Sequence, residues 1–170
     1  MTNLEIIKSK VFNSASEFEK QLNFYRFKKQ KMVFTNGCFD ILHLGHVDYL
    51  SKAADLGDVL IVGLNSDSSV RAIKGENRPI NDLNSRSLLL ASLSFVSAVV
   101  VFNEETPAAL IRHILPDILV KGKDYTIEQI VGADEVIKNG GQVITIELVN
   151  GYSTSLIEKK ILLNANKTGT

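Results

Sequence analysis

The 170-residue sequence predicts a single α/β domain, a doubly wound parallel sheet of five strands with helices on both faces. From residue 32 onward, short apolar runs alternate with segments of helical spacing. Residues 59–64 form an unbroken apolar run, as expected for a parallel strand covered on both faces. Hydrophobic residues make up 45% of the chain and charged residues 22%, so a chain of this length can bury a substantial core.

The first 30 residues differ from the rest and predict a helical extension. Ser14 can cap a helix in which Phe18, Leu22 and Tyr25 share one face. The domain itself is expected at residues 31–163, and the polar residues 164–170 are expected to form a flexible tail.

Composition and chain breakers set the expected elements of the domain. Strands are expected at residues 32–35, 59–64, 98–102, 118–120 and 143–148. Helices are expected at residues 41–56, 68–73, 84–95, 106–115, 131–138 and 153–163. Gly57 is a plausible C-cap of the first of these helices. Thr106 and Pro107 are expected as the cap and first residue of the fourth, which stops at Pro116.

Charge and hydropathy argue against two classes of partner. Lysine plus arginine equals aspartate plus glutamate at 19 each, so no overall field favours nucleic acid or an anionic membrane. No apolar run approaches the ~20 residues of a membrane-spanning helix. A single cysteine and an N-terminal stretch that lacks an apolar core predict a cytoplasmic protein.

The strand-to-helix loops of a parallel sheet meet at the carboxyl edge, where ligands bind. The loops expected at that edge are residues 35–46, 65–82, 121–126 and 149–155. All four contain residues suited to phosphate groups, and their coincidence at one edge strengthens the interpretation of each. We therefore expect a site for phosphorylated ligands there.

The first loop contains two histidines three residues apart at a predicted helix start, His43 and His46. Amide groups at a helix start attract anions, and two imidazoles add donors. Gly45 leaves space for a phosphate, and Gly37 can supply the turn out of the strand. The alternatives are ordinary helix residues with one core histidine, or a zinc site, which needs three or four ligands.

The later loops supply cations and hydroxyls. Lys74 and Arg78 can close over a polyphosphate. Arg86 makes either a surface salt bridge or a phosphate contact. Ser153 and Thr154 either cap the last helix or bind phosphate. Cys38 is interpreted as a small packing residue, because no base is placed for it, and His113 as structural.

These motifs resemble those of a known enzyme family. The segment TNGCFDILHLGH at residues 35–46 resembles the HxGH signature of cytidylyltransferase-like nucleotidyltransferases. Residues 63–67, 74–80, 119–125 and 151–155 are similar to motifs of the adenylyltransferases of ADP-heptose synthesis. The resemblance extends over residues 30–162, and the ordered set of motifs is more specific than HxGH alone.

The resemblance implies a Rossmann-like fold and the transfer of AMP from ATP to D-glycero-β-D-manno-heptose 1-phosphate, for lipopolysaccharide core synthesis. It also implies Mg²⁺ bound mainly through the ATP phosphates, with no protein ligand assigned, and a homodimer. The expected catalytic residues are His43, His46 and Lys74. The expected nucleotide- and phosphate-binding residues are Thr35, Asn36, Gly37, Cys38, Phe39, Gly45, Arg78, Arg86, Lys121, Gly122, Tyr152, Ser153 and Thr154. Sugar or ribose contacts are expected from Asp40, Asn65, Asp67 and Asp124.

The sequence is also compatible with other nucleotidyl transfer reactions and with a purely binding role. Glycerol-3-phosphate cytidylyltransferases carry an arginine shortly before their final Ser-Thr motif, whereas residues 148–151 read LVNG here. That departure weakens the cytidylyltransferase alternative. FMN adenylyltransferase is a second alternative. A non-catalytic nucleotide-binding regulatory domain is a third, and it predicts ATP binding without turnover.

Overall fold

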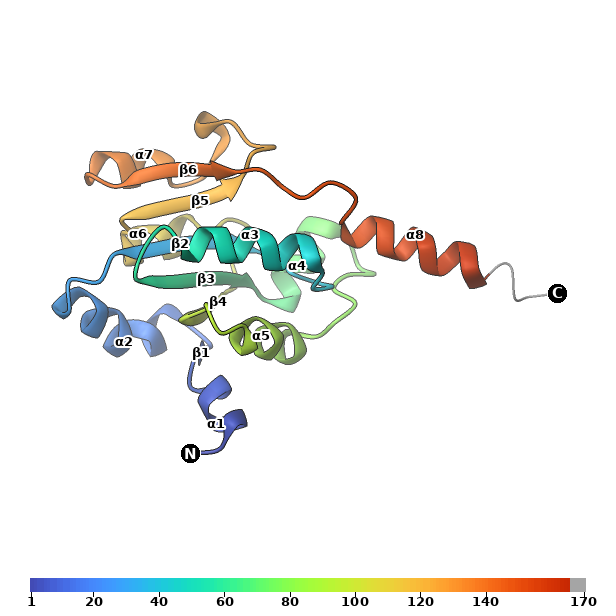
Figure 1. Cartoon of the computed structure of the whole chain (residues 1–170), viewed down its shortest axis with the longest axis horizontal. Coiled ribbons are helices and arrows are strands. Elements are labelled where there is room, and N and C mark those ends of the chain that lie inside the picture. The colour runs from blue at the N-terminus through green and yellow to red at the C-terminus, as the bar shows by residue number, and fades with distance from the viewer. Residues whose placement is uncertain (166–170) are drawn as a thin grey trace.

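The computed structural model describes residues 1–165, which form one sheet of six parallel strands with helices on both faces (Figure 1). The strand order is β1-β4-β3-β2-β5-β6. The strands are β1 (Val11–Phe12), β2 (Met32–Gly37), β3 (Val59–Asn65), β4 (Ala98–Phe102), β5 (Ile118–Gly122) and β6 (Gln142–Ile146).

The five expected strands are all present, and the expected count is wrong by one. The sixth strand, β1, comes from the N-terminal segment and pairs with β4 through Val11–Val99 and Phe12–Val100. A strand of two residues shows no alternation of apolar and polar side chains, so its sequence pattern could not identify it.

Each expected helix is present, and the structure adds α1 and the short 3₁₀ helix η1. The helices are α1 (Asn3–Lys8), α2 (Ala15–Phe27), α3 (Leu44–Ala54), α4 (Asp67–Lys74), α5 (Leu83–Ser92), α6 (Ala108–Ile114), η1 (Ile127–Gln129), α7 (Ala133–Lys138) and α8 (Thr154–Ala165).

Most helix ends differ from the sequence prediction by one to three residues. Helix α3 begins at Leu44 rather than residue 41, because His43 has the extended backbone of an N-cap, with φ −143° and ψ 171°. Pro107, not Thr106, is the N-cap of α6. Helix α8 continues to Ala165, two residues beyond the predicted end. The rest of the expected flexible tail, residues 166–170, lies outside the described residues.

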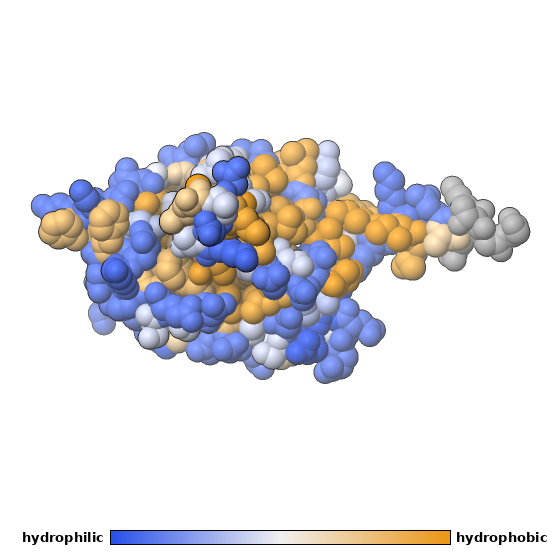
Figure 2. Space-filling model, turned by 90° about the horizontal axis from the view of Figure 1, so that it is seen from below, coloured by the Kyte–Doolittle hydropathy of each residue, from blue (hydrophilic) through white to orange (hydrophobic). Residues whose placement is uncertain are grey.

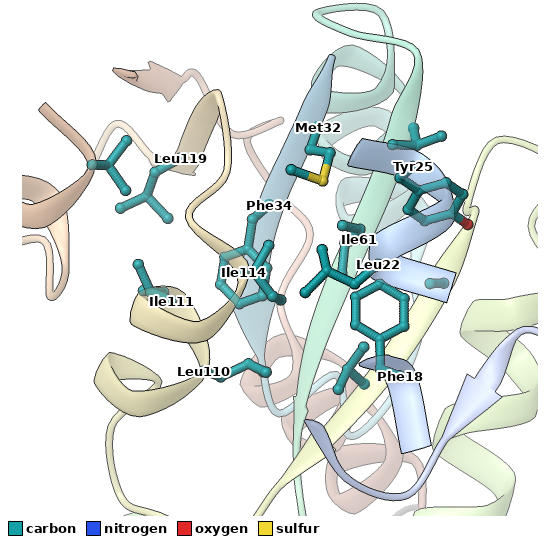
Figure 3. Close-up of a cluster of buried hydrophobic side chains, with 14 of the residues drawn as sticks. Phe18, Leu22, Tyr25, Met32, Phe34, Ile61, Leu110, Ile111, Ile114 and Leu119 are labelled. Atoms are coloured by element: carbon teal, nitrogen blue, oxygen red, sulfur yellow. The ribbon is translucent and has the colours of Figure 1, made fainter. Parts of the chain in front are cut away.

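The core has two halves because successive strand side chains point to opposite faces. On one face, Phe34 of β2 belongs to a cluster with residues of α2, α6 and α7. Figure 3 shows Phe18 and Leu22 of α2 beside Ile114 of α6 in this cluster. On the other face, Val33 packs with residues of α3 and α5.

The N-terminal segment contributes directly to this core. The Ser14 hydroxyl caps α2 by accepting from the Glu17 amide at 3.1 Å, as predicted. Phe18, Leu22 and Tyr25 are buried, as their common helix face indicated. The domain boundary at residue 30 stays a prediction, although β1 and α2 from that segment belong to the sheet and its core.

Within residues 1–165, no helix has both the length and the apolar character needed to cross a bilayer.

Candidate active site

A pocket of about 520 Å³ lies at the carboxyl edge of the sheet. The strand order reverses beside β2, which has β3 on one side and β5 on the other. That reversal is where open α/β sheets bind ligands. The predicted site residues that line the pocket are Asn36, Gly37, Cys38, Phe39, Asp40, His43, Gly45, His46, Asn65, Lys74, Lys121, Gly122, Asp124, Tyr152, Ser153 and Thr154.

The chain leaves β2 through a strained turn. Phe39 has a φ of 46°, in the left-handed region that side chains rarely adopt, and such a residue typically costs roughly 1–3 kcal/mol. Its ring lies edge-on to His46, with centroids 5.2 Å apart. A Cβ on Gly37 would lie 3.0 Å from the Phe39 ring. This turn therefore favours glycine at position 37 and places an aromatic wall beside His46.

The two histidines stack on each other at the start of α3. Their ring centroids are 3.8 Å apart with 19° between the planes, and both Nδ1 atoms are buried without a hydrogen-bond partner. A Cβ on Gly45 would lie 3.1 Å from both His43 Nδ1 and the Tyr152 Cβ. Gly45 therefore permits this stack, as well as the close approach of Tyr152.

Burial holds the histidine pair in its neutral form. The pKa of His46 is lowered to about 4, chiefly by burial and also by electrostatic repulsion from His43 and Lys74. The pKa of His43 is also lowered by burial. Each neutral ring has one N–H donor and one nitrogen acceptor. The pair therefore presents donors to a ligand without a fixed positive charge.

Asp40 anchors the loop at residues 75–82. Its carboxylate accepts from the amides of Ile80 (2.8 Å) and Asn81 (2.9 Å) and from the Arg78 guanidinium (2.9 Å). Burial alone would raise the pKa of this carboxyl group, but the two amides and Arg78 lower it below its usual value. The expected sugar or ribose contact of Asp40 stays a prediction, and in the structure its oxygens hold this loop.

The two cations of the second loop have different environments. Lys74, the last residue of α4, is exposed, lines the pocket and makes no ion pair within residues 1–165. Arg78 is paired with Asp40 and with Glu158 of α8 and does not line the pocket. A contact between Arg78 and phosphate would therefore require it to exchange a carboxylate for the ligand.

Arg86 is 1% exposed and connects four segments beneath the pocket. Its guanidinium donates to the carbonyl oxygens of Cys38 (2.7 Å), Asn65 (2.9 Å) and Asn81 (3.1 Å), and to the Asp67 carboxylate (2.7 Å). These bonds use four of its five N–H donors, and Arg86 does not line the pocket where a phosphate would bind. We therefore interpret Arg86 as a positioning residue, with Asp67 as its partner.

Of the other predicted residues, some line the pocket and others are buried behind its wall. Thr35 is fully buried, and its hydroxyl lies 2.8 Å from the Tyr49 hydroxyl. The Ser153 hydroxyl accepts from the Leu156 amide at 3.1 Å, so it caps α8 while also lining the pocket. Burial raises the pKa of the Cys38 thiol, which agrees with a packing role.

Several lining residues were not predicted: Tyr49, Ile73, Glu105, Tyr125, Leu148, Val149 and Ser155. Tyr49 lies three positions after His46 on α3, so helical spacing could have identified it. Glu105 follows β4. The loop after this parallel strand lies at the carboxyl edge of the sheet, as the four predicted loops do. Within residues 1–165, no group of three or more His, Cys, Asp or Glu side chains is placed to hold a metal ion.

Comparisons with known proteins agree with this geometry. A family model described as cytidylyltransferase-like matches residues 34–160. The bifunctional protein HldE of Histophilus somni is 53% identical over 146 residues, 86% of this chain and 31% of that protein. The chain thus spans less than a third of the curated relatives it matches.

Two solved structures are similar. The lipopolysaccharide core biosynthesis protein from Thermoplasma volcanium is 32% identical, with a TM-score of 0.58 over 73% of this chain and 99% of that one. Pantoate-beta-alanine ligase from Francisella tularensis is 17% identical, with a TM-score of 0.58 over 91% of this chain and 77% of that one, and supports the fold alone. The chain belongs to the cytidylyltransferase-like family of nucleotidyltransferases.

Proposed function

We propose that this chain transfers AMP from ATP to D-glycero-β-D-manno-heptose 1-phosphate and releases pyrophosphate. The observation that carries the proposal is the stacked, neutral His43–His46 pair, with buried unpartnered Nδ1 atoms, in a pocket that Lys74 and Lys121 also line. The heptose acceptor rests on the ordered motifs, and the similar T. volcanium protein is described as a lipopolysaccharide core biosynthesis protein.

The reaction needs alignment and charge neutralisation more than proton transfer. The acceptor is a phosphate monoester with a second pKa near ~6, so its attacking oxygen is already anionic and needs no general base. That oxygen bonds to the α-phosphorus of ATP as the bond to the pyrophosphate oxygen breaks. We assign His43, His46 and Lys74 to the triphosphate, and the start of α8 to further phosphate or nucleotide contacts.

A divalent metal accompanies the nucleotide in this family, and we propose that it is Mg²⁺. Mg²⁺ keeps several waters and is usually bound through one or two carboxylates together with substrate phosphates. Asp124 and Glu105 are carboxylates that line the pocket, and we assign neither as a ligand. Bound to the phosphates, the metal would neutralise charge on the leaving pyrophosphate.

A small substrate matrix tests the proposal. ATP and CTP are each supplied with heptose 1-phosphate, glycerol 3-phosphate or FMN, and released pyrophosphate and the sugar nucleotide are quantified. We expect turnover only with ATP and heptose 1-phosphate, giving ADP-heptose. Turnover with another pair would contradict the acceptor or base assignment. ATP binding without turnover for any acceptor would favour a regulatory domain.

The homodimer expected from the resemblance and the cytoplasmic location both stay predictions. Sedimentation velocity on the full chain tests the first. A single species of monomer mass across the micromolar range would contradict a stable homodimer.

A further inference from the structure

Lys121 lies at the end of β5, is partly buried and lines the pocket. Its ammonium group donates to the carbonyl oxygen of Asn36 at 3.2 Å and lies 5.9 Å from the centroid of the Tyr125 ring. No carboxylate of residues 1–165 lies within 4.0 Å of it, since none of the ion pairs includes Lys121. A desolvated cation without an ionic partner is costly, and an anionic ligand would supply that partner.

A second unsatisfied group lies on the residue that Lys121 contacts. Asn36 also lines the pocket, and its side-chain Oδ1 is buried without a hydrogen-bond partner. A carboxamide oxygen accepts from a hydroxyl or amino group. The two residues together therefore fit a ligand that has an anionic oxygen close to a hydroxyl group, as a sugar 1-phosphate does.

The strand order separates Lys121 from the other pocket lysine. Lys74 ends the helix that follows β3, whereas Lys121 is on β5. Between those two strands lies β2, which leads into the histidine pair at the start of α3. In an in-line transfer, the attacking and leaving oxygens lie on opposite sides of the α-phosphorus. If His46 and Lys74 hold the leaving pyrophosphate, the attacking phosphate approaches from the β5 side.

We propose that Lys121 and Asn36 form the acceptor subsite: the Lys121 ammonium binds the attacking phosphate, and Asn36 Oδ1 accepts from a neighbouring sugar hydroxyl. This inference rests on the proposed function. The new bond joins an oxygen of the acceptor phosphate to the α-phosphorus, and the electron pair of the broken bond leaves with pyrophosphate. Lys121 keeps its proton throughout.

Binding measurements on the full chain test the subsite separately from turnover. Calorimetry measures the Kd of heptose 1-phosphate in the presence of an ATP analogue whose α,β bridge cannot be cleaved, and the Kd of the analogue alone. Loss of a charge-assisted hydrogen bond in Lys121→Met should weaken acceptor binding about 10- to 100-fold. The Kd of the analogue should stay within twofold, and Lys121→Arg should recover part of the loss.

Lys123→Met is the matched control. Lys123 is exposed, pairs with Glu147 and does not line the pocket, so both Kd values should match the wild type. Because Lys121→Met removes a desolvated charge together with a single hydrogen bond to the Asn36 carbonyl oxygen, its Tm should stay close to that of the wild type. A clearly lower Tm would show that Lys121 stabilises the fold and would overturn the subsite.

The pH dependence supplies an independent readout. Burial lowers the pKa of Lys121 to about 8, against the opposing charges of Asp124 and Cys38, the titratable groups that act on it. The ammonium is protonated below that pH, so the affinity for heptose 1-phosphate should fall as the pH rises through 8. In Lys121→Arg this fall should be absent, because arginine keeps its charge. If the affinity of Lys121→Arg for heptose 1-phosphate still fell as the pH rose through 8, the assignment of Lys121 to the acceptor phosphate would be overturned.

The possible outcomes separate the two claims. Wild type that binds heptose 1-phosphate without turnover refutes the proposed function, and the subsite is then decided by the Kd in Lys121→Met. Wild type that turns over, with an unchanged acceptor Kd in Lys121→Met, overturns the subsite alone. A weaker Kd for the ATP analogue with unchanged acceptor binding would place Lys121 on the nucleotide instead. Wild type that binds no heptose 1-phosphate overturns both.

Discussion

At the scale of single residues, the environment of His46 decides its chemistry. The ring is stacked on His43, packed edge-on by Phe39, and close to the charge of Lys74. A positive charge on this ring would be unfavourable next to the charge of Lys74. The neutral ring still has an N–H donor for a phosphate oxygen. The binding contribution of His46 therefore comes from a positioned N–H rather than from a net charge.

An NMR titration of the imidazole resonances tests this neutrality. In the free protein His46 should titrate near pH 4, well below the ~6.5 of an unperturbed histidine. The unfolded chain takes up this proton at higher pH than the folded chain does. The stability owed to neutral His46 is therefore present above pH ~6.5 and lost as the pH falls toward 4. A midpoint near 6.5, assigned with the His46→Gln variant, would contradict the buried stack.

At the scale of elements, the loop at residues 75–82 depends on one carboxylate. Asp40, three residues after the end of β2, accepts from two amides of that loop and from Arg78, which also pairs with Glu158 of α8. The carboxylate therefore fixes the loop to the HxGH segment, and Arg78 links both to α8. Because the pKa of Asp40 is lowered, its contribution to stability is present above pH ~4 and lost on acidification below that pH.

We predict that Asp40→Asn destabilises the fold by roughly 1–3 kcal/mol, the usual cost of leaving a buried hydrogen-bonding group unsatisfied, because Arg78 keeps Glu158 as an ionic partner. It should also make the loop more sensitive to proteolysis. Asp48→Asn is the control: Asp48 pairs with Lys52 on the surface of α3, where such a pair is worth roughly 0.3–0.5 kcal/mol. Urea unfolding measures both. Equal losses in the two variants would show that Asp40 does not anchor the loop.

At the scale of the whole molecule, the N-terminal segment belongs to the sheet and its core. Strand β1 extends the sheet beyond β4, and α2 covers one face with Phe18 and Leu22, both 0% exposed. Phe18→Ala should cost roughly 3–5 kcal/mol, as is typical of phenylalanine truncation in a core. Phe27→Ala on the same helix should cost under ~0.5 kcal/mol, because Phe27 is 81% exposed. Thermal unfolding measures both variants, and similar losses of stability in Phe18→Ala and Phe27→Ala would contradict this role of α2.

Features local in sequence could be predicted, and features that depend on long-range contacts could not. The histidine pair, its glycines and the four loops were identifiable because strand, turn and helix signals follow one another within a few residues. The partners of Arg86 come from three other segments of the chain, and no spacing in its own helix indicates that junction. The same is true of Asp40, whose position in the HxGH segment suggested a ligand contact rather than an anchor for a distant loop.

The most direct test of the central claim follows the α-phosphorus of ATP at the His43–His46 site. With ATP labelled at that phosphorus and heptose 1-phosphate supplied, wild type should place the label in ADP-heptose. His46→Ala should lower kcat by about 100-fold or more with the fold intact, the typical effect of removing a preorganised donor. His113→Ala, whose imidazole pairs with Glu19 away from the pocket, should retain wild-type turnover. Near wild-type kcat in His46→Ala would contradict the account.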